Sequence, residues 1–138
     1  MGLKGNFRVR ALRSVFAVAR RLLPRASDRA ELRSHAIKLA YWPEKKPVAE
    51  SGKLLDLDWD WVKALKGLKV GELRIDDNIG GCNNLRIIFF VGDTKIRKPL
   101  PIVWILHAMQ KKRNDFTKNE LEIFRMRRKL VMEWFYKT

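Results

Sequence analysis

Cysteine and histidine are scarce in this sequence. The chain holds one cysteine, Cys82, and two histidines, so it cannot form an internal disulfide or build a cysteine-based metal site. Because the two histidines are far apart in the sequence, no zinc site is expected. No apolar run is long enough to span a bilayer, and residues 1–25 lack the uninterrupted apolar segment of a secretory signal. We therefore expect a cytoplasmic protein without metal or cofactor.

Acidic residues are also few. The chain has 30 Lys and Arg against 15 Asp and Glu, a formal net charge of +15 and a pI near 10.5. Such a field favours a polyanionic partner: RNA, DNA, an acidic protein or an anionic membrane. The charge is uneven, because residues 1–34 hold nine basic and two acidic residues, whereas residues 43–81 hold seven and eight.

Two amphipathic helices are predicted near the start of the chain. Apolar residues recur at helical spacing over residues 12–23, and Pro24 ends that helix. A second helix is expected over about residues 27–42, and a short strand over residues 7–11. We interpret residues 1–42 as a basic helical segment packed on the same domain, because its apolar stripes need burial. The alternative is a cationic element that contacts RNA, a partner or a membrane surface.

Three strands with basic residues among apolar ones follow, and the domain is expected to be organised around them. They span Glu72–Asp76, Leu85–Val91 and Ile102 to about Lys111, and are rich in residues that fit a half-buried pleated surface. Short breaks with turn residues make antiparallel neighbours the simplest arrangement. Side chains alternate between the two faces of a strand. In the last strand, if no bulge interrupts it, this places on one face Val103, Ile105, His107, Met109 and Lys111.

The remaining segments add aromatic residues and a basic helix. Trp59 and Trp61 are interpreted as core or the lip of the core, with a base-stacking platform as the alternative. Thr117 and Glu120 form a capping-box pattern at the start of a C-terminal helix. Residues 43–138 are therefore predicted to form an α+β domain, a small antiparallel sheet packed against helices.

Basic residues on the three strands form the candidate site. One antiparallel register would gather Arg74, Arg86, His107 and Lys111 or Lys112 on a common sheet surface. Arginine holds phosphate bidentately, and His or Lys can exchange protons, which suits metal-free RNA cleavage. The scattered carboxylates fit a two-metal nuclease poorly. Each residue also has a plainer interpretation: a structural histidine, a solvated strand end, or an arginine paired with a neighbouring acid.

The order GELRI, turn, NLRIIFFVGD, IVWILHAMQKKR and a Thr-capped basic helix resembles the phage-derived, HigB-like branch of the RelE/ParE toxin superfamily. The similarity covers roughly residues 66–133. It implies a compact, RelE-like α+β fold with an antiparallel sheet and helices on one side. It also implies a toxin of a bacterium or phage-infected host, which cleaves mRNA, commonly on the ribosome, and is neutralised by a helix-turn-helix antitoxin.

On this hypothesis the chain is an endoribonuclease with no metal, cofactor or small-molecule ligand. Residues expected to act in catalysis are Arg74, Arg86, His107, Lys111 and Lys112. Residues expected to contact RNA are Arg113, Arg125, Arg128 and Lys129. The alternative is a non-enzymatic interaction module, similar to the gyrase inhibitors or inactive phage-derived relatives of the superfamily, which binds nucleic acid or an acidic partner. Membrane association through residues 7–23 is a further alternative.

Overall fold

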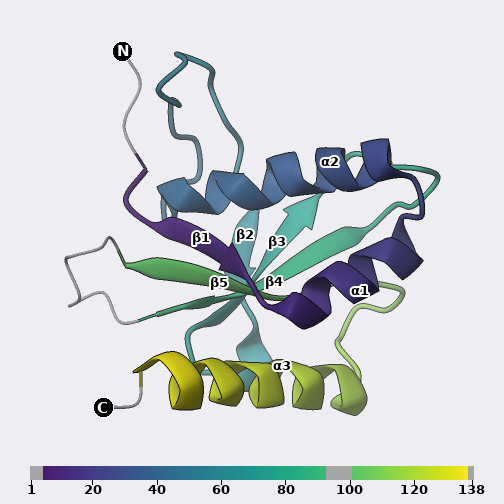
Figure 1. The fold of residues 1–138 in the computed structure, drawn as a ribbon, viewed down its shortest axis with the longest axis vertical. Helices are drawn as coiled ribbons and strands as arrows, with labels where there is room; N and C mark the ends of the chain where they lie inside the picture. The colour runs from purple at the N-terminus through teal and green to yellow at the C-terminus, as the bar shows by residue number, and fades with distance from the viewer. Residues whose placement is uncertain (1–4, 93–100, 137–138) are drawn as a thin grey trace.

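The protein folds into a five-stranded mixed sheet with helices on both faces (Figure 1). The computed structural model describes residues 5–92 and 101–136. Along the chain, the elements are β1 (Arg8–Ala11), α1 (Arg13–Leu22), α2 (Ala26–Ala36), η1 (Ile37–Tyr41), β2 (Trp59–Trp61), η2 (Lys63–Leu65), β3 (Val70–Ile75), β4 (Leu85–Val91), β5 (Ile102–Gln110), α3 (Lys118–Val131) and η3 (Met132–Tyr136). The predicted α+β class is confirmed.

The strand order β1-β5-β4-β3-β2 combines antiparallel and parallel pairing. Antiparallel pairing joins β2 to β3, β3 to β4 and β4 to β5. The short breaks with turn residues predicted this pairing for β3, β4 and β5. β1 instead lies parallel to β5, with Arg8 opposite Ile102. A parallel pair needs a long connection, and the segment from α1 to β4 supplies one. The sheet is therefore mixed rather than antiparallel throughout.

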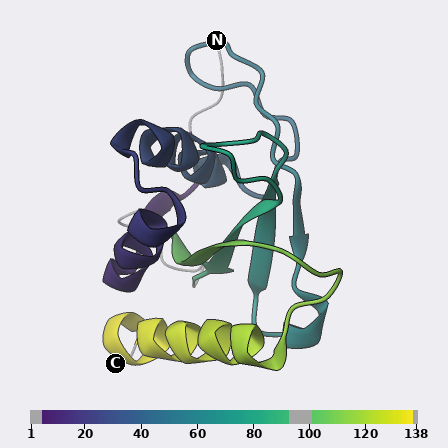
Figure 2. The ribbon, with the colours of Figure 1, turned by 90° about the vertical axis from the view of Figure 1, so that its right-hand side faces the viewer.

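Each face of the sheet carries its own apolar core. On one face, Val15 of α1 and Leu32 of α2 pack with residues such as Ile87 and Phe89. On the other face, Phe124 of α3 packs with residues such as Ile88. β4 is buried on both faces because it lies in the middle of the sheet, so both faces need a cover. The expectation of helices on one side is therefore wrong, and Figure 2 shows α3 apart from the α1–α2 pair.

A bulge in β5 changes the predicted alternation of its side chains. Ile88 is opposite His107, but the next residue, Phe89, is opposite Ile105, so one residue of β5 is extra. Ile105 therefore packs in the α1–α2 core, whereas Met109 packs in the α3 core. The prediction that Ile105 and Met109 share a face is wrong.

The helices begin and end near their predicted positions. α1 matches the apolar spacing of residues 12–23, and α2 continues as a tighter 3₁₀ turn, η1, to Tyr41. At α3, Thr117 accepts a hydrogen bond from the Glu120 amide and Glu120 accepts one in return from the Thr117 amide, which confirms the capping box. Within the described residues, no helix has the length and apolar content required to cross a bilayer.

Candidate active site

Glu72 in the middle of β3 is the one buried charged side chain among the described residues, with 5% of its surface exposed. Three cations from three strands or their ends surround it. Arg74 Nη2 lies 3.2 Å from Glu72 Oε1, while Arg86 Nε and Lys111 Nζ lie 3.7 and 3.8 Å from Oε2. A buried carboxylate is stable only when such partners offset its lost hydration. We call Glu72, Arg74, Arg86 and Lys111 the glutamate cluster.

The sheet register brings the glutamate cluster together. Glu72 and Arg74 are two residues apart on β3, so their side chains share a face. Arg86 of β4 lies directly opposite Arg74, and Met109 of β5 lies directly opposite Arg86. Lys111 follows Met109 by two residues and therefore extends to the same face. Two arginines directly opposite each other repel, and the Glu72 carboxylate offsets that repulsion.

The hydrogen bonding of the cluster is incomplete. Among the described residues, neither Glu72 Oε2 nor Arg86 Nε has a hydrogen-bond partner, although both atoms are buried. Their separation of 3.7 Å is too long for a hydrogen bond. Buried polar atoms are nearly always hydrogen-bonded, whereas these two atoms interact with each other as an ion pair.

Acidic neighbours balance the charge of Arg74. Its guanidinium lies 3.3 Å from Asp58 Oδ1 and 3.8 Å from Asp60 Oδ2, in addition to Glu72. Arg86 and Lys111 have Glu72 as their carboxylate partner. An incoming phosphate would therefore gain more from Lys111 than from Arg74, because Arg74 is already shared among three carboxylates.

The cluster lies against a pocket of about 390 Å³, which we call the glutamate pocket. Glu72, Arg74 and Lys111 line it, and Phe116 contributes aromatic surface. Lys111 Nζ lies 4.4 Å from the centre of the Phe116 ring, within cation–π range. The volume falls within the range of small-ligand sites, about 300–1,000 Å³. The pocket thus combines a proton acceptor, cations and apolar ring surface.

His107 lies on the same face but outside the glutamate cluster. Ile88 of β4 is the register partner of both Glu72 and His107, and so separates them. Arg127 of α3 donates a hydrogen bond to His107 Nδ1 at 2.7 Å and another to the Leu106 carbonyl at 2.8 Å. Burial, and then the Arg127 charge, lower the pKa of His107 to about 4. At neutral pH the imidazole is therefore uncharged.

The other predicted site residues lie apart from the cluster. Lys112 and Arg113 are exposed in the loop after β5. Arg125 and Lys129 form exposed pairs within the C-terminal helix, with Glu122 at 3.5 Å and with Glu133 at 3.9 Å. These pairs are screened by water, and both cations are exposed to solvent.

Arg128 has a structural contact instead. Its Nε donates a hydrogen bond of 2.7 Å to the Leu68 carbonyl, and its guanidinium lies 5.0 Å from the centre of the Phe90 ring. Burial lowers the pKa of Arg128. The residue therefore fastens α3 to the turn that precedes β3.

Glu72 is absent from the site residues expected from the sequence. The signal that could have identified it is a single acid, two residues before Arg74, at a central position of the strand. Its burial could not be predicted, because it depends on side chains from the neighbouring strands, Arg86 and Lys111, and on the docking of α3 on the same face.

A second group of titratable residues lies on the opposite face of the sheet, at α2. His35 Nε2 is 3.2 Å from Asp77 Oδ2, and Glu31 offers a ligand oxygen within 4.8 Å of both. These residue types can bind a divalent cation. Two of the three are exposed, and Lys38 also contacts the imidazole at 3.1 Å. The geometry is that of a surface ion pair, and it has no connection to the glutamate cluster.

Comparisons of the chain with protein-family models, with curated proteins and with solved structures found no match. The class of this protein is therefore assigned from its fold and its candidate site. It is a small α+β protein whose mixed sheet carries a buried carboxylate, ringed by cations, beside an aromatic-lined pocket.

Proposed function

We propose that the protein is a metal-independent endoribonuclease toxin that cleaves mRNA in the cytoplasm, in association with the ribosome, and is neutralised by a cognate antitoxin. One observation carries the proposal: a buried carboxylate lies among three cations and, together with Arg74 and Lys111, lines a pocket of about 390 Å³. Cleavage of RNA through its own 2′-hydroxyl requires only a base, a positive environment and an acid.

The glutamate cluster can divide these roles. The Glu72 carboxylate, which lines the glutamate pocket, takes the proton of the 2′-hydroxyl, and the 2′-oxygen forms a bond to phosphorus. Arg86, together with Arg74, stabilises the negative charge that develops on the phosphoryl oxygens. Lys111 gives a proton to the 5′-oxygen as its bond to phosphorus breaks. The products are a 2′,3′-cyclic phosphate and a free 5′-hydroxyl, and no metal takes part.

The predicted roles of the remaining residues follow from their positions. His107 is uncharged at neutral pH and its Nδ1 is occupied by Arg127, so it suits orientation of the RNA better than donation of a proton. Lys112 and Arg113, with Arg125 and Lys129 on the C-terminal helix, are exposed and suit contacts to phosphates. The partners proposed are thus mRNA, the ribosome and an antitoxin.

The test is inducible expression of the wild type beside Glu72→Gln and Arg86→Lys, with growth followed and the 5′ ends of mRNA mapped. Growth arrest with new internal ends, lost in both variants, supports the ribonuclease. Glu122→Gln is the matched control, because Glu122 is an exposed acid paired with Arg125. Circular dichroism checks that each purified variant is folded. New ends that persist in folded Glu72→Gln contradict the assigned base.

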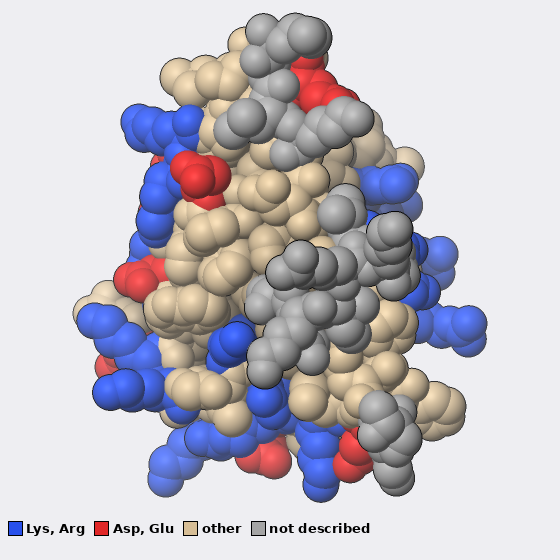
Figure 3. Space-filling view, turned by 90° about the vertical axis from the view of Figure 1, so that its left-hand side faces the viewer, with Lys and Arg blue, Asp and Glu red and all other residues tan. Residues whose placement is uncertain are grey.

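A second candidate is a non-enzymatic module that binds nucleic acid or an acidic partner, as a gyrase inhibitor does. It is favoured by the charge balance at Arg74, which already contacts three carboxylates, and by the many exposed cations. In Figure 3, Lys and Arg outnumber Asp and Glu along the lower part of the face shown. Growth arrest without new mRNA ends favours this candidate, as does loss of affinity rather than turnover in Arg86 and Lys112 variants.

A further inference from the structure

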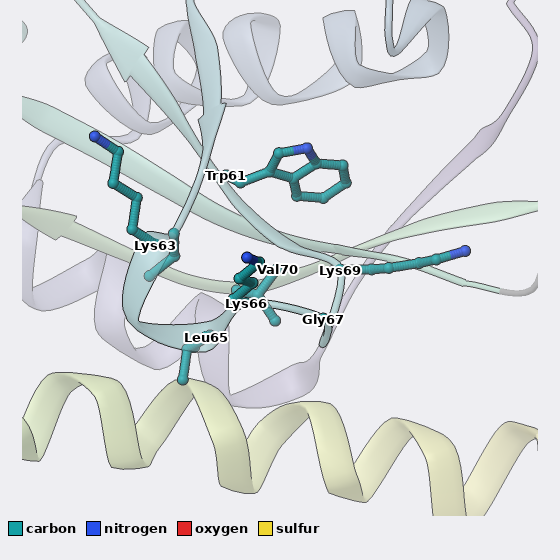
Figure 4. A pocket seen from close by; sticks show the side chains of 8 residues that line it. Trp61, Lys63, Leu65, Lys66, Gly67, Lys69 and Val70 are labelled. Carbon is teal, nitrogen blue, oxygen red and sulfur yellow. The ribbon is translucent and has the colours of Figure 1, made fainter.

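A second pocket adjoins the glutamate pocket at the edge of the sheet. Its volume is about 360 Å³, and it is formed by the end of β2, by η2 and by the turn before β3. Trp61, Lys63, Lys66 and Lys69 line it, and none of the described residues in the lining is acidic. Figure 4 shows the Trp61 indole above the loop, with the side chains of Lys63 and Lys69 extending to opposite sides. We call this the lysine pocket.

The backbone of the loop places the three lysines around the pocket. Lys63 begins η2, whereas Lys66 and Lys69 lie in the turn that leads from η2 to β3. Gly67 and Lys69 then adopt positive φ angles of 86° and 57°, and the chain reverses into β3. A lysine rarely adopts the left-handed region, and this strained position at Lys69 is a feature often found at functional sites. All three lysines are exposed.

The lysines carry a net positive charge that nearby acids do not cancel. None of the three forms an ion pair with a carboxylate among the described residues, whereas Arg74 in the glutamate pocket contacts three. A phosphate entering the lysine pocket would therefore meet uncompensated cations. The local field favours an anion here more strongly than at Arg74.

Trp61 supplies a rigid aromatic surface beside these cations. Its ring lies edge-to-face against Trp59, with centroids 5.1 Å apart, and against Trp42 at 5.6 Å. It nevertheless remains 40% exposed. Trp59, by contrast, donates a hydrogen bond to the Pro43 carbonyl and contacts Phe89 in the core. Because Trp61 is already held in place, a base that stacks on it would lose little more side-chain entropy.

The two pockets share a wall. Trp61, Val62 and Lys63 line both of them. Asp60 lies opposite Glu72 and Trp61 lies opposite Gly71, so the Trp61 side chain is on the other face of the edge strand β2. A chain that leaves the glutamate pocket would therefore reach the indole by passing around this edge. We infer that the lysine pocket is a subsite for single-stranded RNA, in which a nucleobase stacks on Trp61 and the lysines bind the flanking phosphates. The inference rests on the proposed function and extends it to substrate class. A duplex fits poorly, because its bases are stacked on each other and unavailable to the indole.

The experiment measures binding of a fluorescent 2′-O-methyl RNA of about eight nucleotides, the size range of single-strand sites. This probe lacks the 2′-hydroxyl nucleophile, so binding is measured without cleavage. Fluorescence anisotropy gives the affinity at several salt concentrations for the wild type, Trp61→Ala, Trp61→Phe and the double variant Lys66→Ala/Lys69→Ala. The control is Lys46→Ala/Lys53→Ala, which removes the same charge from exposed positions outside the pocket.

Trp61→Ala should weaken binding about 5- to 100-fold, the range for loss of one stacked base, and Trp61→Phe should weaken it less. Lys66→Ala/Lys69→Ala should reduce the salt slope of log affinity by about 1.4, since each phosphate contact contributes about 0.7. Equal losses in the control variant would overturn the subsite, as would a wild type that does not bind the probe. Thermal melts distinguish lost binding from lost folding, and the exposed lysine variants should fold as the wild type does.

Cleavage assays separate this inference from the proposed function. If the subsite holds RNA, Trp61→Ala should raise KM for single-stranded RNA while kcat changes little. A protein that binds the probe through Trp61 but never cleaves RNA retains the subsite and loses the ribonuclease. A protein that cleaves RNA while Trp61→Ala and Lys66→Ala/Lys69→Ala bind as the wild type does retains the ribonuclease and loses the subsite.

Discussion

The charge of Glu72 holds together residues that would otherwise repel. Removing it in Glu72→Gln leaves Arg86 and Lys111 without the carboxylate that lies 3.7 and 3.8 Å from them. Breaking a buried ion pair costs about 3–5 kcal/mol, and the isosteric Gln should lie near the lower end. Urea denaturation at neutral pH measures the loss. Asp60→Asn, at an exposed partner of Arg74, should cost about 0–1 kcal/mol. Equal stability in the two variants would show that Glu72 is not the essential counter-ion.

His107 should make the protein less stable in mild acid. The folded protein holds the His107 pKa at about 4, below its ordinary 6.5, so the unfolded chain takes up a proton in that interval that the folded protein does not. The contribution to stability is complete above pH 6.5 and is lost as pH falls to 4. Allowing for partial exposure, we expect about 1–2 kcal/mol.

His107→Gln is the variant that tests this titration. Its side-chain oxygen can accept the Arg127 hydrogen bond, but it does not titrate. Urea midpoints measured between pH 7 and pH 4 should therefore fall less steeply in His107→Gln than in the wild type. Parallel pH profiles in the two proteins would assign the acid sensitivity to another group.

The sequence placed only part of the candidate site. Strand alternation alone puts Arg74 and Glu72 on one face. The approach of Arg86 and Lys111 depends on the register between strands, which strand alternation leaves open. The pairing of His107 with Arg127 depends on where α3 docks, which the apolar pattern of the helix leaves open.

At the scale of single elements, α3 depends on its first turn. Thr117→Ala removes the side-chain oxygen that accepts from the Glu120 amide at 3.1 Å. Loss of such a cap costs about 1 kcal/mol, and denaturant unfolding measures it. Thr117→Ser keeps the hydroxyl and should retain most of the stability. If both variants lose the same amount, the methyl group rather than the cap is responsible.

The pairing of β3 with β4 requires glycine at position 71. A Cβ at Gly71 would lie 2.5 Å from the ring of Phe89, its cross-strand partner, which is fully buried. Gly71→Ala should therefore cost about 1–3 kcal/mol through overpacking. In the Phe89→Leu background the same change should cost less, and a double-mutant cycle gives the coupling. Additive losses would indicate that the ring moves aside freely.

The order and type of the long elements could be predicted, whereas their arrangement could not. Turn residues and apolar patterns marked β3, β4, β5 and both ends of α1. The three-residue β2 is too short for a periodic signal. The parallel pairing of β1 depends on a contact with residues near 102, far along the chain. Single-sequence periodicity carries no information on such contacts.

At the scale of the whole molecule, the charge of +15 opposes folding through self-repulsion. Raising the ionic strength from about 0.05 to about 0.5 M shortens the Debye length and weakens that repulsion. The urea midpoint should therefore rise with salt over this range, whereas RNA affinity should fall. A midpoint that falls or stays constant would mean that local ion pairs, such as those of Glu72, outweigh the net charge.

The parallel pairing of β1 with β5 also sets an order of events during synthesis. β1, α1 and α2 leave the ribosome long before the strand that β1 joins has been translated. Until β5 emerges, β1 has no partner at this edge, and the apolar sides of α1 and α2 lack the sheet surface that they cover. A nascent chain stalled before β5 should bind chaperones and be cut by protease in this region, and it should become resistant once β5 is released.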